Sequence, residues 1–590
     1  MSGTGSALLA VALVVVATVG IGVGGLRLAR STSDFLVASR TVSPLWNASA
    51  IGGEYLSAAS FLGVAGLVLA YGADALWYPV GFVAGYFLLL LFVAAPLRRS
   101  GAYTVPDFAE VRLGSDRLRR LCALAVLAIG LLYLVPQLQG AGLALRATTG
   151  AKVWVGAVLV AVVVTGNVAG GGMRSATFVQ ACQYWLKLTA LAVPVVFLLL
   201  AWQADARPDL AGPAGPVFRA QTTVQVDADV RFVVAEPVQV VVDGQPRRLE
   251  AGAHRLERGA RAVFPEGAAV PHVVGLAPAT GTSWAQPLSG AGGVEHPLYA
   301  TYALVVATFL GTMGLPHVLV RFYTNPDGRA ARRTTLVVLA LLGAFYLLPA
   351  LYGALGRLYT PELLLTGRTD AVVLALPVAA VGGPLGQALQ ALLVAGAFAA
   401  FLSTSSGLLV TCAGVLAQDL LPAGRRGTVR GFQLATVLGG AAALALALPA
   451  AALPLTQVVG LAFAVAASTF CPLLVLGIWW RGLTAQGAAA GLLVGGGLSA
   501  LAVTTTLTGA VDGGWAGALL AQPAAWTAPT AFAVMVTGSL LTRSTVPADV
   551  GRTMLRLHAP ETLGLPPEPD RSAPGSTARR SQPVARRTGA

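Results

Sequence analysis

The sequence predicts an all-α membrane protein that crosses the bilayer about thirteen times. The composition gives the first reason, because hydrophobic residues make up 56% of the 590 positions and charged residues only 11%, unlike soluble domains. A series of long apolar runs gives the second, since each run is near or above the roughly 20 residues that a spanning helix needs. The distribution of arginine between these runs gives the third.

The first apolar run covers residues 7–29 and ends at Arg27 and Arg30, whereas residues 1–6 carry no basic side chain. A secretory signal peptide has its basic residues before the apolar run. We therefore predict that residues 1–30 form a retained transmembrane helix with its N-terminus outside. The further apolar runs lie near residues 45–72, 74–96, 118–146, 151–170, 175–202, 298–320, 333–356, 384–416, 428–450, 455–480, 484–508 and 524–542.

Basic side chains fall in every second connection between these runs, as expected when the N-terminus is outside. The other short connections are nearly free of Lys and Arg, with Arg357 and Arg368 as the exceptions. An odd number of crossings then places the C-terminus in the cytoplasm and predicts a multi-pass protein of the plasma membrane. The basic residues are Arg27, Arg30, Arg40, Arg98, Arg99, Arg117, Arg119, Arg120, Arg174, Arg321, Arg329, Arg332, Arg333, Arg425, Arg426, Arg430, Arg481, Arg543, Arg552 and Arg556.

The formal net charge of +14 does not indicate a nucleic-acid partner. Its arginines are spread over short connections and the tail, and they form no basic face or stripe of the kind that binds nucleic acid. We interpret the charge as a determinant of topology and as attraction to anionic lipid at the cytoplasmic surface.

Two segments lie outside the membrane in this scheme. Residues 203–297 include partly alternating runs at 222–230 and 238–245, which predict a small β-rich extracellular insertion. The alternative is a loop elaboration that is merely tolerated at low cost. The cytoplasmic tail, residues 544–590, is predicted to be mostly disordered, because residues 559–590 are rich in Pro, Arg, Ser and Gly.

The second apolar run is interrupted by Gly52 and Gly53, followed by Glu54, Ser57 and Ser60. Polar groups at this depth are tolerated only where protein or a water-filled cavity surrounds them. We predict a helix that is broken at the glycine pair and contributes to a binding site. The alternative is a glycine-rich packing face whose serines bond back to the helix.

A second interruption lies in the run 298–320, where Gly314 and Pro316 break the hydrogen-bond ladder. The two interrupted helices are an odd number of crossings apart, so they enter the membrane from opposite sides. This pattern predicts an inverted repeat with a transport site between the breaks, which a simple channel does not require. The predicted units are residues 45–202 and 298–480, with two further helices in residues 484–543.

The sequence offers no pattern for catalysis. It has no His cluster with carboxylates at ligand spacing, no Gly-rich phosphate loop and no nucleophile with an adjacent base. The cysteines lie in apolar runs without paired spacing, which indicates neither a disulfide framework nor a zinc site; they are Cys122, Cys182, Cys412 and Cys471. We therefore predict that the protein is not an enzyme and has no cofactor or metal other than a coupling ion.

Four stretches carry a more specific pattern. They are EYLSAASFLG at 54–63, GGM at 171–173 with Val179 and Gln180, GLPHVLVRF at 314–322, and AFLST at 400–404 with Asp419 and Leu420. These stretches resemble the sodium/solute symporter family, and above all its cation/acetate and short-chain monocarboxylate branch. The Gly-x-Pro-His-x-x-x-Arg-Phe string is the most specific of them. The insertion and the tail have no counterpart in this resemblance.

The resemblance implies a LeuT-type fold of five plus five helices. It also implies a sodium ion between the first and eighth helices of that core. The implied ligands are the carbonyls of Gly53, Leu56 and Ala400 and the hydroxyls of Ser403 and Thr404. Uncharged oxygen atoms at half-helix ends suit a hard cation such as sodium. The alternative is that the two hydroxyls serve only helix packing.

Four further polar residues have open roles. Glu54 is longer than the Asp that is usual in the acetate branch, and we expect it to tune the cation site, to bridge to another span or to pair internally. Gln180 stands where some sodium-dependent relatives carry Asp, which argues against a second cation site. His317 is either a proton relay or a partner for backbone groups at the break. Lys187 either extends to an interface or pairs within the bundle.

A small carboxylate substrate is expected between the two breaks. Positive half-helix ends with free N–H groups can hold an anion there without a deep arginine. Amide and hydroxyl groups at these positions alternatively bridge helices. The candidate lining residues are Ser60, Tyr133, Gln137, Thr312 and Met313.

The combined prediction is a sodium-coupled secondary symporter that imports acetate, propionate or pyruvate-like anions by alternating access. Its predicted partners are the monocarboxylate, sodium and the lipid bilayer. The alternatives are a proton-coupled permease, a permease for another small solute such as proline or a sugar, and a transporter-derived ligand sensor. The short Pro- and Arg-rich tail, without a signalling domain, argues against the sensor.

Overall fold

The computed structural model describes residues 3–26, 35, 37–38, 42–210, 215–226, 229–276, 281–288, 296–422, 427–449, 455–511, 513–560 and 563. The predicted disorder of residues 559–590 therefore lies outside the described residues, apart from 559, 560 and 563. The same holds for five of the basic residues used to predict topology, which are Arg27, Arg30, Arg40, Arg425 and Arg426.

Helices form most of the described chain. The long ones are α1 (Gly3–Leu26), α8 (Asp116–Thr149), α9 (Val153–Ala204), α11 (Pro297–Gly314), α13 (Gly328–Tyr359), α16 (Gly383–Val415), α17 (Val429–Ala447), α18 (Leu455–Trp479), α19 (Ala485–Thr508) and α21 (Ala524–Leu541). The shorter ones are α3 (Pro44–Tyr55), η2 (Ala59–Gly63), α4 (Val64–Tyr71), η3 (Gly72–Leu76), α5 (Trp77–Leu88), η4 (Leu89–Val93), α6 (Ala94–Arg99), α7 (Val105–Leu113), α10 (Gly281–Ala285), α12 (Pro316–Val320), η5 (Arg321–Thr324), α14 (Leu363–Thr366), η6 (Thr369–Ala371), α15 (Val372–Ala380), η7 (Leu416–Leu420), α20 (Gly514–Ala521), η8 (Arg543–Thr545) and α22 (Val550–His558).

Short polar side chains fix where several helices begin. Each accepts a hydrogen bond from the backbone N–H three residues later, which satisfies a donor that the first helical turn leaves free. The capping residues are Thr104 for α7, Ser115 for α8, Asp327 for α13, Thr428 for α17 and Thr484 for α19.

Within the described residues, eleven helices are long and apolar enough to cross a membrane. The two longest have at least about twice the roughly 20 residues of one crossing, since Ala59–Arg99 has 41 residues and Val153–Ala204 has 52. Each contains a glycine with positive φ, namely Gly72 at 63° and Gly172 at 54°. The hydropathy pattern predicts two separate runs in each of these two stretches. The predicted number of crossings, about thirteen, is therefore higher than the number of long apolar helices.

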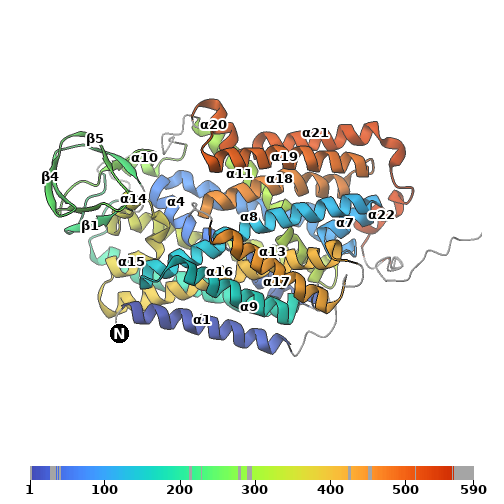
Figure 1. Ribbon diagram of the computed structural model, residues 1–590, viewed down its shortest axis with the longest axis horizontal. Coiled ribbons are helices and arrows are strands. Elements are labelled where there is room, and N and C mark those ends of the chain that lie inside the picture. Colours follow the sequence, from blue (N-terminus) through green and yellow to red (C-terminus); the bar gives the residue numbers. More distant parts are fainter. Residues whose placement is uncertain are drawn as a thin grey trace, which may run out of the picture.

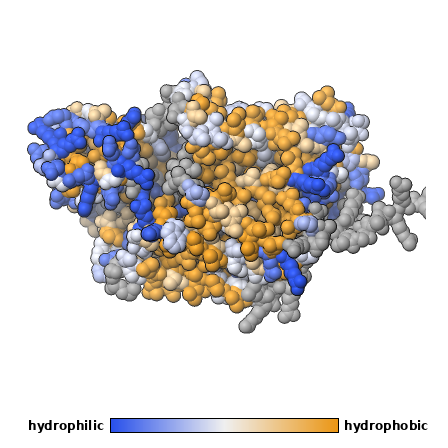
Figure 2. Space-filling model, in the orientation of Figure 1, coloured by the Kyte–Doolittle hydropathy of each residue, from blue (hydrophilic) through white to orange (hydrophobic). Residues whose placement is uncertain are grey.

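The helices run roughly parallel, and the strands project from one end of the bundle (Figure 1). The start of α1 lies at the strand end, whereas α22 lies at the opposite end (Figure 1). Figure 2 shows hydrophobic residues over the middle of this face and hydrophilic residues toward both ends. An apolar belt between polar ends is the surface expected of a membrane-spanning helical protein.

Seven strands between residues 222 and 273 form two small antiparallel sheets, in the orders β1-β6-β3-β4 and β5-β2-β7. Apolar side chains alternate with exposed ones along β2, so that Val230, Phe232 and Val234 face a small core. This core also contains Leu365 of α14. The strands are β1 (Thr222–Gln225), β2 (Val230–Val234), β3 (Val238–Val242), β4 (Gln245–Leu249), β5 (Gly252–Leu256), β6 (Arg261–Phe264) and β7 (His272–Val273).

Two helices are interrupted inside the bundle. The helical path α3–η2–α4 leaves α-helical geometry at Leu56, where ψ is 77°. The path α11–α12 is interrupted at Leu315, with ψ of 114°, directly before Pro316. Both interruptions lie in buried surroundings, because Leu56, Leu315 and Pro316 are all buried.

Candidate functional site

The first break lies three residues later than the sequence suggested. Gly52 and Gly53 belong to the regular helix α3, and the prediction that the glycine pair itself is the break is therefore wrong. Their role is close packing against α9. A Cβ atom on Gly52 would lie 2.8 Å from the Tyr184 ring, and one on Gly53 would lie 2.2 Å from the carbonyl oxygen of Gln180.

The break releases backbone carbonyls from the helix. The Ser57 N–H donates to the Tyr55 carbonyl at 2.8 Å, which leaves the Gly53 carbonyl without its usual helical partner. Buried carbonyls need replacement donors. The Glu54 carbonyl receives one from the Thr404 hydroxyl of α16 at 2.7 Å.

The other freed carbonyls bind the side chain of Lys187, which projects from α9 and is fully buried. Its Nζ donates to the carbonyls of Gly53 and Leu56, the latter at 2.7 Å. A third bond goes to the Ser403 hydroxyl at 3.0 Å. An ammonium group has three donors, so these acceptors use all of them. We call Gly53, Leu56 and Ser403 the oxygen cradle.

Three of the five predicted sodium ligands thus form the oxygen cradle around a lysine ammonium. Of the remaining two, the Ala400 carbonyl accepts from the Ser403 hydroxyl at 3.1 Å, and Thr404 bonds to the Glu54 carbonyl. The structure brings the predicted residues together. The sequence did not anticipate that Lys187 lies among them.

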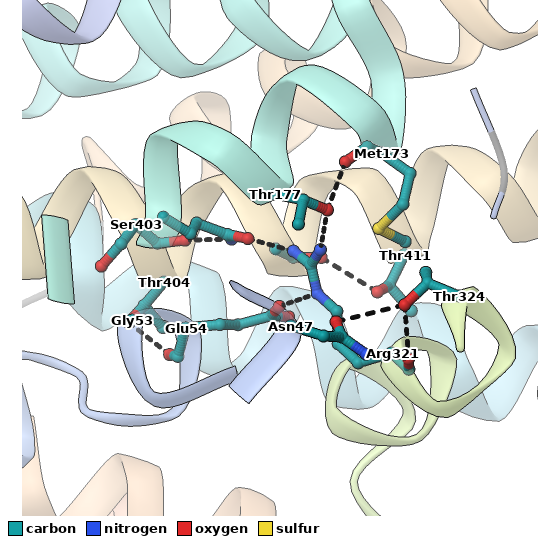
Figure 3. Close-up of polar contacts among 12 residues, drawn as sticks. Asn47, Gly53, Glu54, Met173, Thr177, Arg321, Thr324, Ser403, Thr404 and Thr411 are labelled. Atoms are coloured by element: carbon teal, nitrogen blue, oxygen red, sulfur yellow. Dashed lines mark hydrogen bonds and ion pairs between the residues drawn. The ribbon is translucent and has the colours of Figure 1, made fainter. Parts of the chain in front are cut away.

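Glu54 pairs with Arg321, the first residue of η5. Arg321 Nε lies 2.6 Å from Glu54 Oε2, and both side chains are 1% exposed. Figure 3 shows the guanidinium pointing between Glu54 and Thr177. Its Nη1 donates to the Thr177 hydroxyl at 2.8 Å and its Nη2 to Gln180 Oε1. This ion pair joins α3 to η5, so it fits both the bridging and the internal-pairing alternative for Glu54.

Arg321 is fully buried inside the bundle. The prediction that it belongs to a basic cytoplasmic connection is therefore wrong. The available signal was its spacing, one helical turn after His317 in the string that follows the second break. Gln180 links this ion pair to α16, because its Nε2 donates to the Ser403 carbonyl at 2.8 Å.

The predicted substrate residues are all buried, and none of them lines the pocket beside Pro316 and Val320 or the pocket beside Pro216 and His272. Ser60 Oγ lies 3.0 Å from the Tyr346 hydroxyl. Thr312 Oγ1 lies 2.8 Å from the Tyr55 hydroxyl. In this conformation, these groups bridge helices.

An aromatic cluster that the sequence did not predict connects the candidate substrate residues. Tyr55 contacts Tyr86 at a ring-centroid distance of 4.7 Å and Phe82 at 5.9 Å. Phe82 stacks on Tyr346 at 5.9 Å, and Phe463 lies 6.3 Å from both Tyr55 and Tyr133. Aromatic residues in apolar runs resemble ordinary core residues, so no sequence pattern singles them out.

Two buried polar side chains beside this cluster have no hydrogen-bond partner among the described residues. They are Gln137 of α8, through both amide atoms, and His317 of α12, through both ring nitrogens. The His317 ring meets Tyr133 edge to face at 5.3 Å. The prediction that His317 satisfies backbone groups is therefore not what the structure shows. Buried polar atoms without partners are rare and need an explanation.

The chain has relatives among known proteins. A sequence model of the sodium:solute symporter family matches residues 35–206 and 273–495. Strands β1 to β6 lie in the unmatched interval. The chain is 30% identical over 494 residues to the monocarboxylic acid transporter of Corynebacterium glutamicum, covering 80% of this chain and 78% of that protein. It is 29% identical over 475 residues to the uncharacterized symporter YwcA of Bacillus subtilis, covering 79% of each.

The fold has a counterpart among solved structures. It is similar to a Na⁺-coupled sialic acid symporter in a substrate-bound, outward-open state, with a TM-score of 0.59, 12% identity, and coverage of 91% of this chain and 98% of that one. At this identity, the likeness shows the fold alone, which is a helical membrane fold of the LeuT type.

Proposed function

Because the chain belongs to the sodium:solute symporter family, we propose that it imports small monocarboxylates such as acetate, propionate and pyruvate-like anions by alternating access. The 30% identity to a monocarboxylic acid transporter supports this substrate class. The observation that carries the proposal is the pair of interrupted helices, because the second break lies beside buried polar side chains that have no hydrogen-bond partner among the described residues. Such breaks form substrate and ion sites in transporters of this kind.

We further propose thirteen crossings in the plasma membrane, obtained by dividing the two longest helices at Gly72 and Gly172. The N-terminus and the strand-containing segment then lie outside, and α22 lies in the cytoplasm. The placement of α1 and the strands at one end of the bundle and of α22 at the other supports this topology (Figure 1).

The carboxylate is proposed to bind between the second break and α8. Gln137 supplies an amide donor that has no partner in the described part of the chain, and His317 supplies ring nitrogens. Thr312 and Ser60 contribute hydroxyls that exchange their present tyrosine partners for substrate, while Met313 and Tyr133 enclose its apolar part. Mostly apolar walls with a few placed polar groups are typical of small-molecule sites.

Membership of the family implies sodium as the coupling ion. The oxygen cradle, Ala400 and Thr404 supply the uncharged oxygen atoms that were predicted for it. Lys187 is the departure, because its ammonium occupies the centre of the oxygen cradle. The identity of the substrate and that of the driving cation are therefore separate questions, which need separate measurements.

Counterflow into proteoliposomes tests the substrate class without any ion gradient. Vesicles loaded with unlabelled pyruvate should take up labelled pyruvate transiently, and external acetate or propionate should compete, whereas proline or glucose should not. Protein-free vesicles correct for the neutral acids that cross lipid unaided. Competition by proline or glucose, but not by monocarboxylates, would replace the proposal with a permease for another solute.

A further inference from the structure

Tyr86 of α5 belongs to the aromatic cluster, and no contact within the described residues accounts for its hydroxyl. We propose that Tyr86 is a specificity-determining residue of the substrate site, and that its hydroxyl selects monocarboxylates with an oxygen atom on carbon 2, which are the 2-oxo and 2-hydroxy acids. This inference rests on the proposed transport of monocarboxylates and narrows the substrate class. Tyr86 lies within an apolar run, and no sequence motif points to it.

The Tyr86 hydroxyl is buried without a hydrogen bond. The side chain is 0% exposed, and its oxygen has no partner among the described residues. By contrast, the Tyr55 hydroxyl bonds to Thr312 at 2.8 Å, and the Tyr346 hydroxyl bonds to Ser60 at 3.0 Å. A phenylalanine would pack the same ring without the free-energy cost of burying an unpaired polar atom. A ligand that supplies an oxygen atom would satisfy the Tyr86 hydroxyl.

Close helix packing holds Tyr86 beside the second interrupted helix. Gly85 precedes it in α5, and a Cβ atom on Gly85 would lie 2.5 Å from the Thr312 Cβ of α11. The Tyr86 ring meets the Tyr55 ring edge to face at a centroid distance of 4.7 Å. Because Tyr55 itself bonds to Thr312, a candidate substrate residue, Tyr86 borders the proposed substrate site.

The groups proposed to hold the carboxylate lie next to another residue of the cluster, Tyr133 of α8. The Tyr133 ring meets the His317 ring at 5.3 Å. Gln137 follows Tyr133 by one helical turn, and therefore lies on the same face of α8. Tyr133 is also within electrostatic range of the Tyr86 hydroxyl. A ligand whose carboxylate binds Gln137 and His317 therefore directs its carbon chain toward Tyr86.

The chemistry of carbon 2 decides whether a ligand satisfies this hydroxyl. Acetate and propionate present only a methyl or an ethyl group beyond the carboxylate, so the buried hydroxyl stays unpaired. Pyruvate presents a carbonyl oxygen that accepts from it, and lactate presents a hydroxyl that can accept or donate. A site that hydrogen-bonds a substrate oxygen discriminates against the analogue without it, because the buried protein group then loses its partner.

Competition during counterflow tests this selection. Proteoliposomes that contain the full chain are loaded with unlabelled pyruvate, and labelled pyruvate is added outside together with a competitor. Propionate has the same number of carbon atoms as pyruvate, so the pair isolates the oxygen atom. Half-inhibition by propionate should require about tenfold more competitor than half-inhibition by pyruvate, the factor expected from one hydrogen bond. Lactate should compete about as well as pyruvate, and equal competition by propionate would overturn the proposal.

The variant Tyr86→Phe removes only the hydroxyl. It should reduce the preference for pyruvate over propionate by about tenfold, and its melting temperature should not fall, because no hydrogen bond among the described residues is lost. Tyr352→Phe is the matched control, since the Tyr352 hydroxyl is also buried but donates to the Leu191 carbonyl at 3.0 Å. This control should lower the melting temperature and keep the wild-type preference. A wild-type preference in Tyr86→Phe would contradict the proposal.

The outcomes separate this inference from the proposed function. If Tyr86→Phe does not fold, the order of pyruvate, lactate and propionate as competitors of the wild type decides alone. If the wild type shows no counterflow of any monocarboxylate, the transport function itself fails and the role of Tyr86 falls with it. Normal counterflow with equal competition by pyruvate and propionate would leave the transport function intact and remove only the role of Tyr86.

Discussion

A glycine allows close helix packing at both helix breaks, but the polar groups beside the two breaks differ. At the first break, Gly53 allows α3 to approach α9, and at the second, Gly314 allows α11 to approach α18, where an added Cβ would lie 2.2 Å from the Ala466 carbonyl. The first break is filled by Lys187, whose three donors are all used. Beside the second break, His317 has no hydrogen-bond partner among the described residues.

This difference suggests that the two breaks have different functions. At the first break, the three donors of the Lys187 ammonium are already used by protein oxygen atoms, so this break has little to offer a diffusible anion. A break beside amide and imidazole groups that lack a hydrogen-bond partner within the described residues retains the capacity to bind one. Arg321 connects the two regions, because it follows the second break in sequence and pairs with Glu54 at the first.

Removal of the Arg321 charge should have the largest effect, because it cuts this connection. Arg321→Met leaves the Glu54 carboxylate buried and unpaired, which should cost about 3–5 kcal/mol of unfolding free energy. Thermal unfolding in detergent measures the loss. The double variant with Glu54→Gln should recover a large part of it. Equal stability of Arg321→Met and wild type would show that the ion pair is not a structural link between the breaks.

The packing at the first break should be the next most sensitive feature. Gly53→Ala forces a Cβ atom toward the backbone oxygen of Gln180, and such overpacking should destabilise the fold by roughly 1–3 kcal/mol. Gly20→Ala in α1 is the control, since its Cβ would meet nothing within 4 Å. The same thermal unfolding assay applies to both. If both variants unfold alike, close approach of α3 to α9 is not what Gly53 provides.

At the second break, the expected effect is on substrate rather than on stability. Gln137→Leu removes an amide that has no hydrogen-bond partner among the described residues, so the melting temperature should stay near that of wild type. Loss of a hydrogen bond to a carboxylate should raise KM for pyruvate by about tenfold. Counterflow kinetics measure this change. An unchanged KM, or a strong loss of stability, would assign Gln137 to helix packing.

The smallest predicted effect concerns one hydroxyl at the first break. Thr404→Val removes the bond to the freed Glu54 carbonyl and should cost about 1 kcal/mol of stability. Thr436→Val in α17 is the matched comparison, because that hydroxyl bonds only to a carbonyl of its own helix and its loss should cost less. A reversed order would argue against a special role for the freed carbonyl.

The sequence predicted the main features of this arrangement from local patterns. Composition and family motifs predict the two interruptions, their location in buried helices, and the pair Ser403 and Thr404 facing the first of them. They do not predict the exact point of the first break. Gly52 and Gly53 are flexible residues, but the helix ends only where Lys187 and Thr404, which are distant in sequence, supply donors for the freed carbonyls.

The charged residues were harder to place for the same reason. Lys187 and Arg321 look alike in the sequence, as single basic residues in or beside apolar runs. Their partners are Leu56, 131 residues away, and Glu54, 267 residues away. Periodicity and hydropathy describe neighbours within a helix, and they contain no information on such pairs.

The strand-containing segment is not an independently transplantable module. Its small core includes Leu365, which belongs to α14 in the helical part of the chain and is 0% exposed. If residues 215–276 were moved to another protein, the transplanted segment would lack part of its hydrophobic core. Excision of the same residues would uncover an apolar side chain on the parent, so any transplant should carry α14 as well.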